Sequence, residues 1–185
     1  SGFSADGSSL LFSEYGAPDS NVSALSLDAA SQPRVIVGEP GPQYGARLSP
    51  DGKWVVYASD VRGGEPEIFV RRFDGGAAKW QVSSGGGRAP IWSKDGKEIF
   101  FLQGESVMAA TVLTEGETLS FAAPQKLFDM PPGRRHERSV TPYDVSVDGS
   151  KFLFARQSRS AVDDRHINVV LNWSEELESR VPRGK

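Results

Sequence analysis

Few residues in this chain have the type and spacing that catalysis or metal binding requires. The two histidines, His136 and His166, are fewer than the three or more converging ligands of a zinc site. Asp163 and Asp164 lack the further spaced oxygen ligands of a calcium site. Ser106 comes nearest to the Gly-x-Ser-x-Gly elbow of serine hydrolases, but the second glycine is missing and the serine lies in an expected hairpin. The sequence therefore predicts no catalytic residue, no metal ligand and no cofactor.

Composition narrows the function classes further. The glycine run at 85–87 lacks the Gly-Lys-Ser/Thr ending of a phosphate loop, and we interpret it as a tight connection between two strands. The absence of cysteine excludes disulfides, thiolate metal sites and cysteine nucleophiles. A net charge of −3 argues against nucleic acid as a partner, because that requires a basic surplus. No apolar run approaches the length of a membrane helix, so we expect no membrane span in this chain.

The most conspicuous carboxylates belong to a repeat. The phrase Ser-x-Asp-Gly occurs four times, with its aspartates at Asp6, Asp51, Asp95 and Asp148, spaced 45, 44 and 53 residues apart. The aspartate can accept backbone N–H groups within a tight turn, and the glycine can take the positive φ that closes it. Since the four carboxylates occupy the same hairpin of successive units, we expect them to hold shape rather than to converge on a substrate.

A strand that is apolar on both faces follows each turn. The fifth residue after the glycine is aromatic in every unit: Phe12, Tyr57, Phe101 and Phe154. Strands of this kind lie between two neighbouring sheets. A period near 45 residues with four strands per unit is typical of β-propeller blades.

The sequence thus predicts a single all-β domain over 1–185, built as an open or partial β-propeller of about four four-stranded antiparallel blades. The blades are expected at 1–38, 39–84, 85–129 and 130–174. The inner strand of the first blade is expected to be short or missing. The last blade is expected to end on a strand at Ile167–Trp173, followed by a short C-terminal helix over 174–181.

The stretch at 49–60 reads Ser-Pro-Asp-Gly-Lys-Trp-Val-Val-Tyr-Ala-Ser-Asp. Together with the segments 66–71, 79–83 and 85–96, it resembles the WD-like repeats of TolB-type propellers. The ending at 167–177 is similar to the C-terminus of bacterial multidomain proteins that join a kinase or regulatory domain to such a propeller. The resemblance implies a binding or sensing module, part of a larger bacterial protein, in the periplasm or otherwise beyond the inner membrane. The cysteine-free composition fits the cytoplasm equally well. Family members usually carry six or more blades, and this chain has about four.

The residues that differ between units are the candidates for binding. Connections from an outer to an inner strand gather at one face of a propeller, and here they carry Tyr44, Arg47, Arg88, Tyr143 and a long insert at 130–141. From these we select Tyr44, Arg88, Arg135 and Tyr143 as the candidate contacts. Arginines beside tyrosines suit an acidic peptide, a phosphate or a carboxylate. The plain alternative is an exposed loop whose charge serves solubility.

Three functions follow from these observations. The first is a non-enzymatic module that recognises a protein, peptide or ligand through those loops. The second is a half-propeller that self-associates through its open blade edges into a larger closed propeller. The third is the accessory propeller of a hydrolase.

Overall fold

The structure is a computed structural model that describes residues 2–4, 6–14, 20–28, 31–60, 63–115, 118–130 and 141–154. The described residues form β-strands, turns and loops, and none of them lies in a helix. Within these ranges there is accordingly no helix long and apolar enough to cross a bilayer. The predicted all-β class is therefore confirmed. The strand predicted at Ile167–Trp173 and the helix predicted over 174–181 lie outside the described residues.

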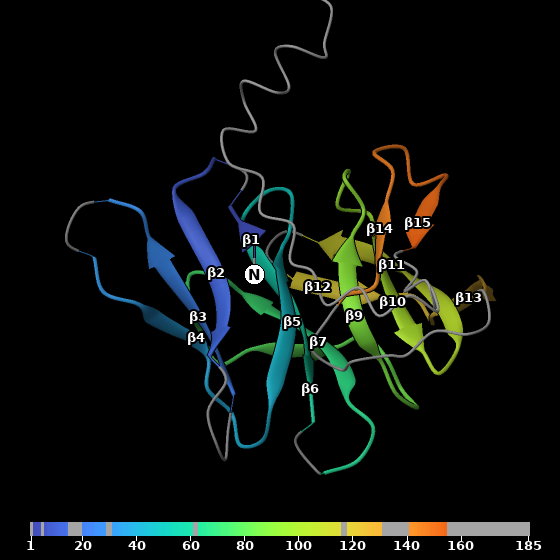
Figure 1. Cartoon of the computed structure of the whole chain (residues 1–185), viewed down its shortest axis with the longest axis horizontal. Helices are drawn as coiled ribbons and strands as arrows, with labels where there is room; N and C mark the ends of the chain where they lie inside the picture. Colours follow the sequence, from blue (N-terminus) through green and yellow to red (C-terminus); the bar gives the residue numbers. More distant parts are fainter. Residues whose placement is uncertain are drawn as a thin grey trace, which may run out of the picture.

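Four antiparallel sheets follow one another in chain order, from the first at the left of Figure 1 to the fourth at its upper right. The first sheet contains β1 (Gly2–Phe3), β2 (Ser9–Glu14), β3 (Asn21–Ser26) and β4 (Arg34–Val37). The second contains β5 (Gln43–Leu48), β6 (Trp54–Ser59), β7 (Glu67–Arg72) and β8 (Lys79–Gln81). The third contains β9 (Arg88–Trp92), β10 (Glu98–Gln103), β11 (Ser106–Glu115), β12 (Thr118–Phe121) and β13 (Gln125–Asp129). The described part of the fourth contains β14 (Tyr143–Val145) and β15 (Phe152–Phe154).

The third sheet departs from the predicted four strands. Its strand β11 is ten residues long and pairs with β13 in its first half and with β12 in its second half. The end of β11 and β12 thus form a hairpin that the sequence interpretation missed. The first sheet agrees with its prediction, since the inner strand β1 is only two residues long.

All four Ser-x-Asp-Gly phrases form the same hairpin turn. In the second copy the Ser49 hydroxyl donates to Asp51 Oδ1 at 2.5 Å, while Ser49 Oγ accepts the backbone N–H of Trp54 at 2.9 Å. The backbone N–H of Lys53 donates to the same carboxylate at 3.1 Å, and Gly52 has a φ of 71°. The other copies repeat these bonds within a few tenths of an ångström. The structural role predicted for the aspartates is confirmed, and the serine emerges as an equal partner.

Apolar residues join each sheet to the next. Tyr57 of β6 packs in a core shared with the first sheet, while Val56 of the same strand belongs to the core that contains Phe101 of the third. Phe100, the neighbour of Phe101, faces the fourth sheet and packs edge-on against Phe152 at a ring-centroid distance of 5.2 Å. Successive residues of a strand point to opposite faces, so one strand contributes to two cores. The double-faced apolar strands predicted from sequence lie between neighbouring sheets, as expected.

Candidate functional site

A groove lies where the inner strands of the sheets approach one another. It has a volume of about 570 Å³ and is lined by residues from β1, β5, β9 and β14 and from the turns that follow β5 and β9. Its apolar wall includes Phe3, Ile91 and Trp92. Its charged residues are Arg47, Lys94 and Asp144. We call this hollow the axial groove.

Bulges in the two central inner strands shape the region around the groove. The pairing of β5 with β6 shifts between Tyr44 and Arg47, and the pairing of β9 with β10 shifts in the same way beyond Arg88. The bulge of β5 contains Gly45 with a φ of 66°, and that of β9 contains Ala89 with a φ of 52°. A positive φ is unusual for alanine, and residues held in this way cluster near functional sites. The bulges re-aim the following side chains relative to a regular strand.

Tyr143, one of the four residues predicted to bind a partner, is buried and bonded to the neighbouring sheet. Its hydroxyl donates to the Ala89 carbonyl oxygen at 3.0 Å, and only 5% of the residue is exposed. Burial raises the pKa of this hydroxyl, while Arg47 and Arg88 act in the opposite direction. The phenol therefore stays protonated at neutral pH and serves as a donor that ties β14 to β9.

Two half-buried arginines flank this tyrosine. Burial lowers the pKa of both Arg47 and Arg88, and the charge of Asp144 opposes the shift at Arg47. A guanidinium remains charged despite such a shift. Arg88 Nη2 donates to the Gly104 carbonyl oxygen at 2.9 Å, whereas its buried Nη1 has no hydrogen-bond partner among the described residues. Arg47 Nη1 donates to the Ala46 carbonyl oxygen at 3.0 Å.

The structure brings together three of the four predicted site residues. Tyr44 and Tyr143 both contribute to the electrostatic surroundings of Arg88, while Arg135 lies outside the described residues. The prediction that these residues sit in loops is wrong for the three described: Tyr44 lies in β5, Arg88 begins β9 and Tyr143 begins β14. The two tyrosines are also buried, so they form the support of the region rather than an exposed contact surface.

The three charged residues of the axial groove were not selected for the predicted site. They are Arg47, Lys94 and Asp144. Arg47 and Asp144 each lie two positions before the serine of their Ser-x-Asp-Gly phrase, and Lys94 lies directly after that serine in the third copy. Their positions relative to the repeated phrase could have identified them, because residues at equivalent positions of successive blades face the same axis.

The glycine run at 85–87 connects β8 to β9, as the sequence interpretation expected. The backbone N–H groups of Gly85 and Gly86 both donate to Glu67 Oε1 at 2.9 Å, and the Ser83 hydroxyl bonds the other carboxylate oxygen. Successive N–H groups in such a loop form a concavity suited to an anion. Here the carboxylate of β7 occupies it, so the loop is held against its own sheet, the second.

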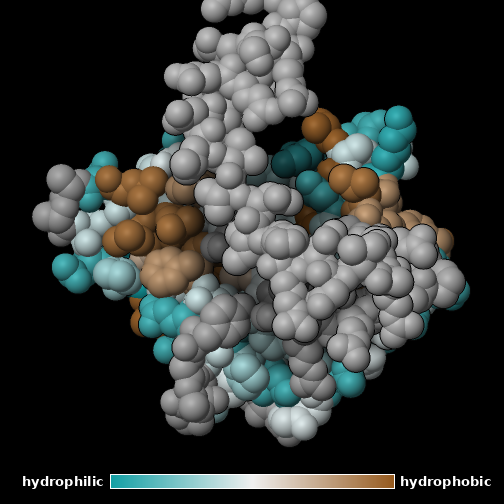
Figure 2. Space-filling view, in the orientation of Figure 1, coloured by the Kyte–Doolittle hydropathy of each residue, from teal (hydrophilic) through white to brown (hydrophobic). Residues whose placement is uncertain are grey.

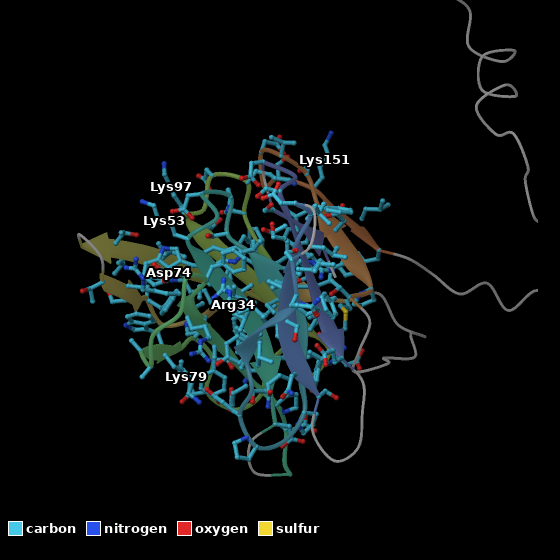
Figure 3. All side chains as sticks on the ribbon, turned by 90° about the vertical axis from the view of Figure 1, so that its left-hand side faces the viewer. Arg34, Lys53, Asp74, Lys79, Lys97 and Lys151 are labelled. Atoms are coloured by element: carbon cyan, nitrogen blue, oxygen red, sulfur yellow. The ribbon has the colours of Figure 1, made fainter. Side chains whose placement is uncertain are left out.

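A second hollow of about 580 Å³ lies between the hairpins of the second and third sheets. Lys53 and Lys97 stand on its rim and point outward from neighbouring hairpins (Figure 3). Trp54 forms part of its floor beneath Arg72, whose guanidinium carbon lies 5.6 Å from the ring centroid. Because Trp54 is buried, its ring face is not open for stacking with a ligand.

The described residues hold no group of three or more His, Cys, Asp or Glu side chains suited to a metal ion. Ser106 donates to Asp129 Oδ1 at 2.7 Å, a bond between the neighbouring strands β11 and β13. The two histidines and the Asp163–Asp164 pair lie outside the described residues.

No protein-family profile matches the sequence, and no curated protein matches it. Among solved structures, the chain is similar to TolB from Acinetobacter baumannii, with 23% identity and a TM-score of 0.56 over 84% of this chain and 37% of that one. It is also similar to a putative TolB from Agrobacterium tumefaciens, with 20% identity and a TM-score of 0.52 over 69% of this chain and 48% of that one. A putative 6-phosphogluconolactonase from Bacteroides uniformis gives 17% identity and a TM-score of 0.50, over 82% and 45%. The chain thus spans half or less of each of these proteins, and its sheets form a partial β-propeller that resembles TolB in fold.

Proposed function

We propose that this chain is a non-catalytic recognition module that holds an acidic peptide segment of a partner protein in the axial groove. The supporting observation is the composition of that groove. The groove is lined by two cationic residues, Arg47 and Lys94, and by one carboxylate, Asp144, together with the apolar side chains of Phe3 and Ile91. Arginine and lysine beside apolar walls suit a chain that carries both carboxylates and hydrophobic side chains.

The axial groove is also rigidly supported. The groove is built on strands rather than on long loops, and the hydrogen bond from Tyr143 to Ala89 locks two of its walls together. A preorganised site loses little conformational entropy when it binds, which favours affinity for an extended peptide. The sheets supply this rigidity because each shares an apolar core with the next.

The test uses fluorescence anisotropy with a labelled Glu-Gly repeat peptide, and a Gln-Gly repeat as the uncharged control. We expect the Glu peptide to bind more tightly and to lose affinity as salt rises. Lys94→Glu should weaken binding about threefold to tenfold, because one charge at the groove is reversed. Lys151→Glu is the matched control, since Lys151 also lies at a repeated hairpin but not in the groove. Equal binding of the two peptides, or equal effects of the two substitutions, would refute the proposal.

A second candidate function is self-association of the chain as a half-propeller. One specific observation favours it: the outer face of the first sheet exposes large apolar residues, among them Leu27 and Val35. Exposed apolar patches on a sheet mark interaction surfaces. Concentration-dependent mass in solution is its direct test. A location beyond the inner membrane remains a prediction from the sequence resemblance alone.

A further inference from the structure

Equivalent residues of the repeated sheets show which face of each sheet is buried against a neighbour. In the strand after each Asp-Gly turn, the residues on one face pack against the preceding sheet. Tyr57 in the second sheet and Phe101 in the third occupy this position, and both are fully buried. Phe12 holds the same position in the first sheet, which has no preceding sheet among the described residues. Among the described residues no sheet covers this face, which is interior in the second and third sheets.

The register of the first sheet defines this surface. Phe12 pairs with Ser23, which pairs in turn with Val35, while Leu10 lies opposite both Phe3 and Leu25. Directly opposed residues of antiparallel strands point to the same side. We call this surface the leading face, and its members are Phe3, Leu10, Phe12, Leu25, Leu27 and Val35.

Comparison with the second sheet supports the assignment. Leu27 directly follows β3, just as Phe73 directly follows β7 in the second sheet. In both cases the backbone N–H donates to the carbonyl oxygen of the residue after the Asp-Gly turn. Phe73 packs into the core between the first and second sheets, whereas Leu27 is 50% exposed. Val35 is 54% exposed. Figure 2 shows hydrophobic residues gathered at the left of the view, where Figure 1 places the first sheet.

The fourth sheet carries the complementary half. Phe152 and Phe154 pack toward the third sheet, so Leu153 between them points to the opposite side. The equivalent residues Leu11, Val56 and Phe100 are all buried against the sheet that follows them. Leu153 is 75% exposed. We call the side of the fourth sheet that bears Leu153 the trailing face.

Building on the proposed self-association, we infer that the chain assembles head to tail, with the leading face of one copy against the trailing face of a second copy. The two exposed faces are the two halves of an interface that the chain already forms three times within itself. When each copy contributes both faces, two copies close a ring in which each first sheet gains a predecessor and each fourth sheet gains a successor. Such a closed head-to-tail dimer covers the leading face and the trailing face of both copies.

The experiment is sedimentation velocity over a wide concentration range, on the whole chain and on three variants. Leu27→Asp/Val35→Asp alters the leading face, and Leu153→Asp alters the trailing face. Leu113→Asp/Leu127→Asp is the matched control, because these leucines of the third sheet are similarly exposed but lie on neither face. All substituted residues are at least 45% exposed, so the folded chain should survive, and thermal unfolding verifies it.

We expect a dimer whose dissociation constant rises at least about tenfold in both face variants and stays unchanged in the control, because a carboxylate would be buried against apolar residues. A mixture of the two face variants should associate more tightly than either alone, since one interface of the mixed dimer combines two unaltered faces. A monomer at all concentrations would overturn self-association and the head-to-tail arrangement together. A dimer disrupted by the leading-face variant but not by Leu153→Asp would overturn the head-to-tail arrangement alone.

Discussion

The repeated serine offers the sharpest test of how the hairpins stabilise the fold. Ser49→Ala and Ser146→Ala delete the same two hydrogen bonds, one donated to the aspartate and one accepted from a backbone N–H at 2.9 Å. The two sites differ in burial. The bond to the Trp54 N–H is buried, whereas the equivalent bond in the fourth hairpin is exposed.

The expected magnitudes follow from this difference. A buried N–H left without a partner costs about 1–3 kcal/mol, whereas an exposed N–H bonds to water instead. Ser49→Ala should therefore destabilise the chain by about 2 kcal/mol, and Ser146→Ala by about 0.5 kcal/mol. For a chain of this length, each kcal/mol corresponds to a shift of about 2–4 °C in Tm.

Urea denaturation followed by tryptophan fluorescence measures both effects, because Trp54 adjoins the first site. Ser49→Thr retains the oxygen and should recover most of the lost stability. Equal losses in Ser49→Ala and Ser146→Ala, or a larger loss in the latter, would refute the reasoning that burial sets the strength of the hairpin.

Three further outcomes follow from the structure. The hydroxyls of Ser146 and Ser150 lower the pKa of Asp148 from 3.8 to about 2. The ionised Asp148 therefore stabilises the fold fully above pH 3.8, and this stabilisation is lost as the pH falls to about 2. Asp148→Asn should flatten the stability–pH profile in this range. Gly87→Ala should cost about 1–3 kcal/mol by chemical denaturation, since a Cβ there would lie 2.6 Å from Ile68 Cγ1, and an unchanged midpoint would contradict this packing. Tyr143→Phe leaves the buried Ala89 carbonyl without its donor and should lower the free energy of unfolding by about 1–2 kcal/mol in the same assay. An unchanged free energy of unfolding would show that this hydrogen bond between the sheets does not stabilise the fold.

Much of the fold could be predicted because the repeat couples turn chemistry to strand patterning. An Asp-Gly turn followed by an apolar strand fixes a hairpin locally, and an aromatic residue at one position in every unit fixes which face meets the preceding sheet. Residues Tyr57 and Phe101 follow this rule. The β11–β12 hairpin was missed because it adds a strand to the four that the repeat predicts, and its few apolar residues, Leu113, Leu119 and Phe121, form no continuous apolar run.

The candidate site was only partly predictable. The tyrosines and Arg88 were identified by their place between blades, but their burial depends on contacts between sheets that no local pattern encodes. Tyr143, for example, finds its acceptor Ala89 54 residues away along the chain. Arg47 was named in the connections between blades but was not selected. Lys94 was not considered, because a charged residue in a turn usually faces solvent, and only the assembled inner strands create a groove around it.

The proposal that the axial groove binds an acidic segment is tested most directly by the indole N–H signals of the tryptophans, observed by NMR during titration with the Glu-Gly repeat peptide. Trp92 lines both the axial groove and the second hollow, whereas Trp54 lines the second hollow alone. Our account predicts a saturable shift of the Trp92 signal while the Trp54 signal stays in place. A Trp54 signal that shifts together with that of Trp92, or no shift of the Trp92 signal on saturation, would contradict it.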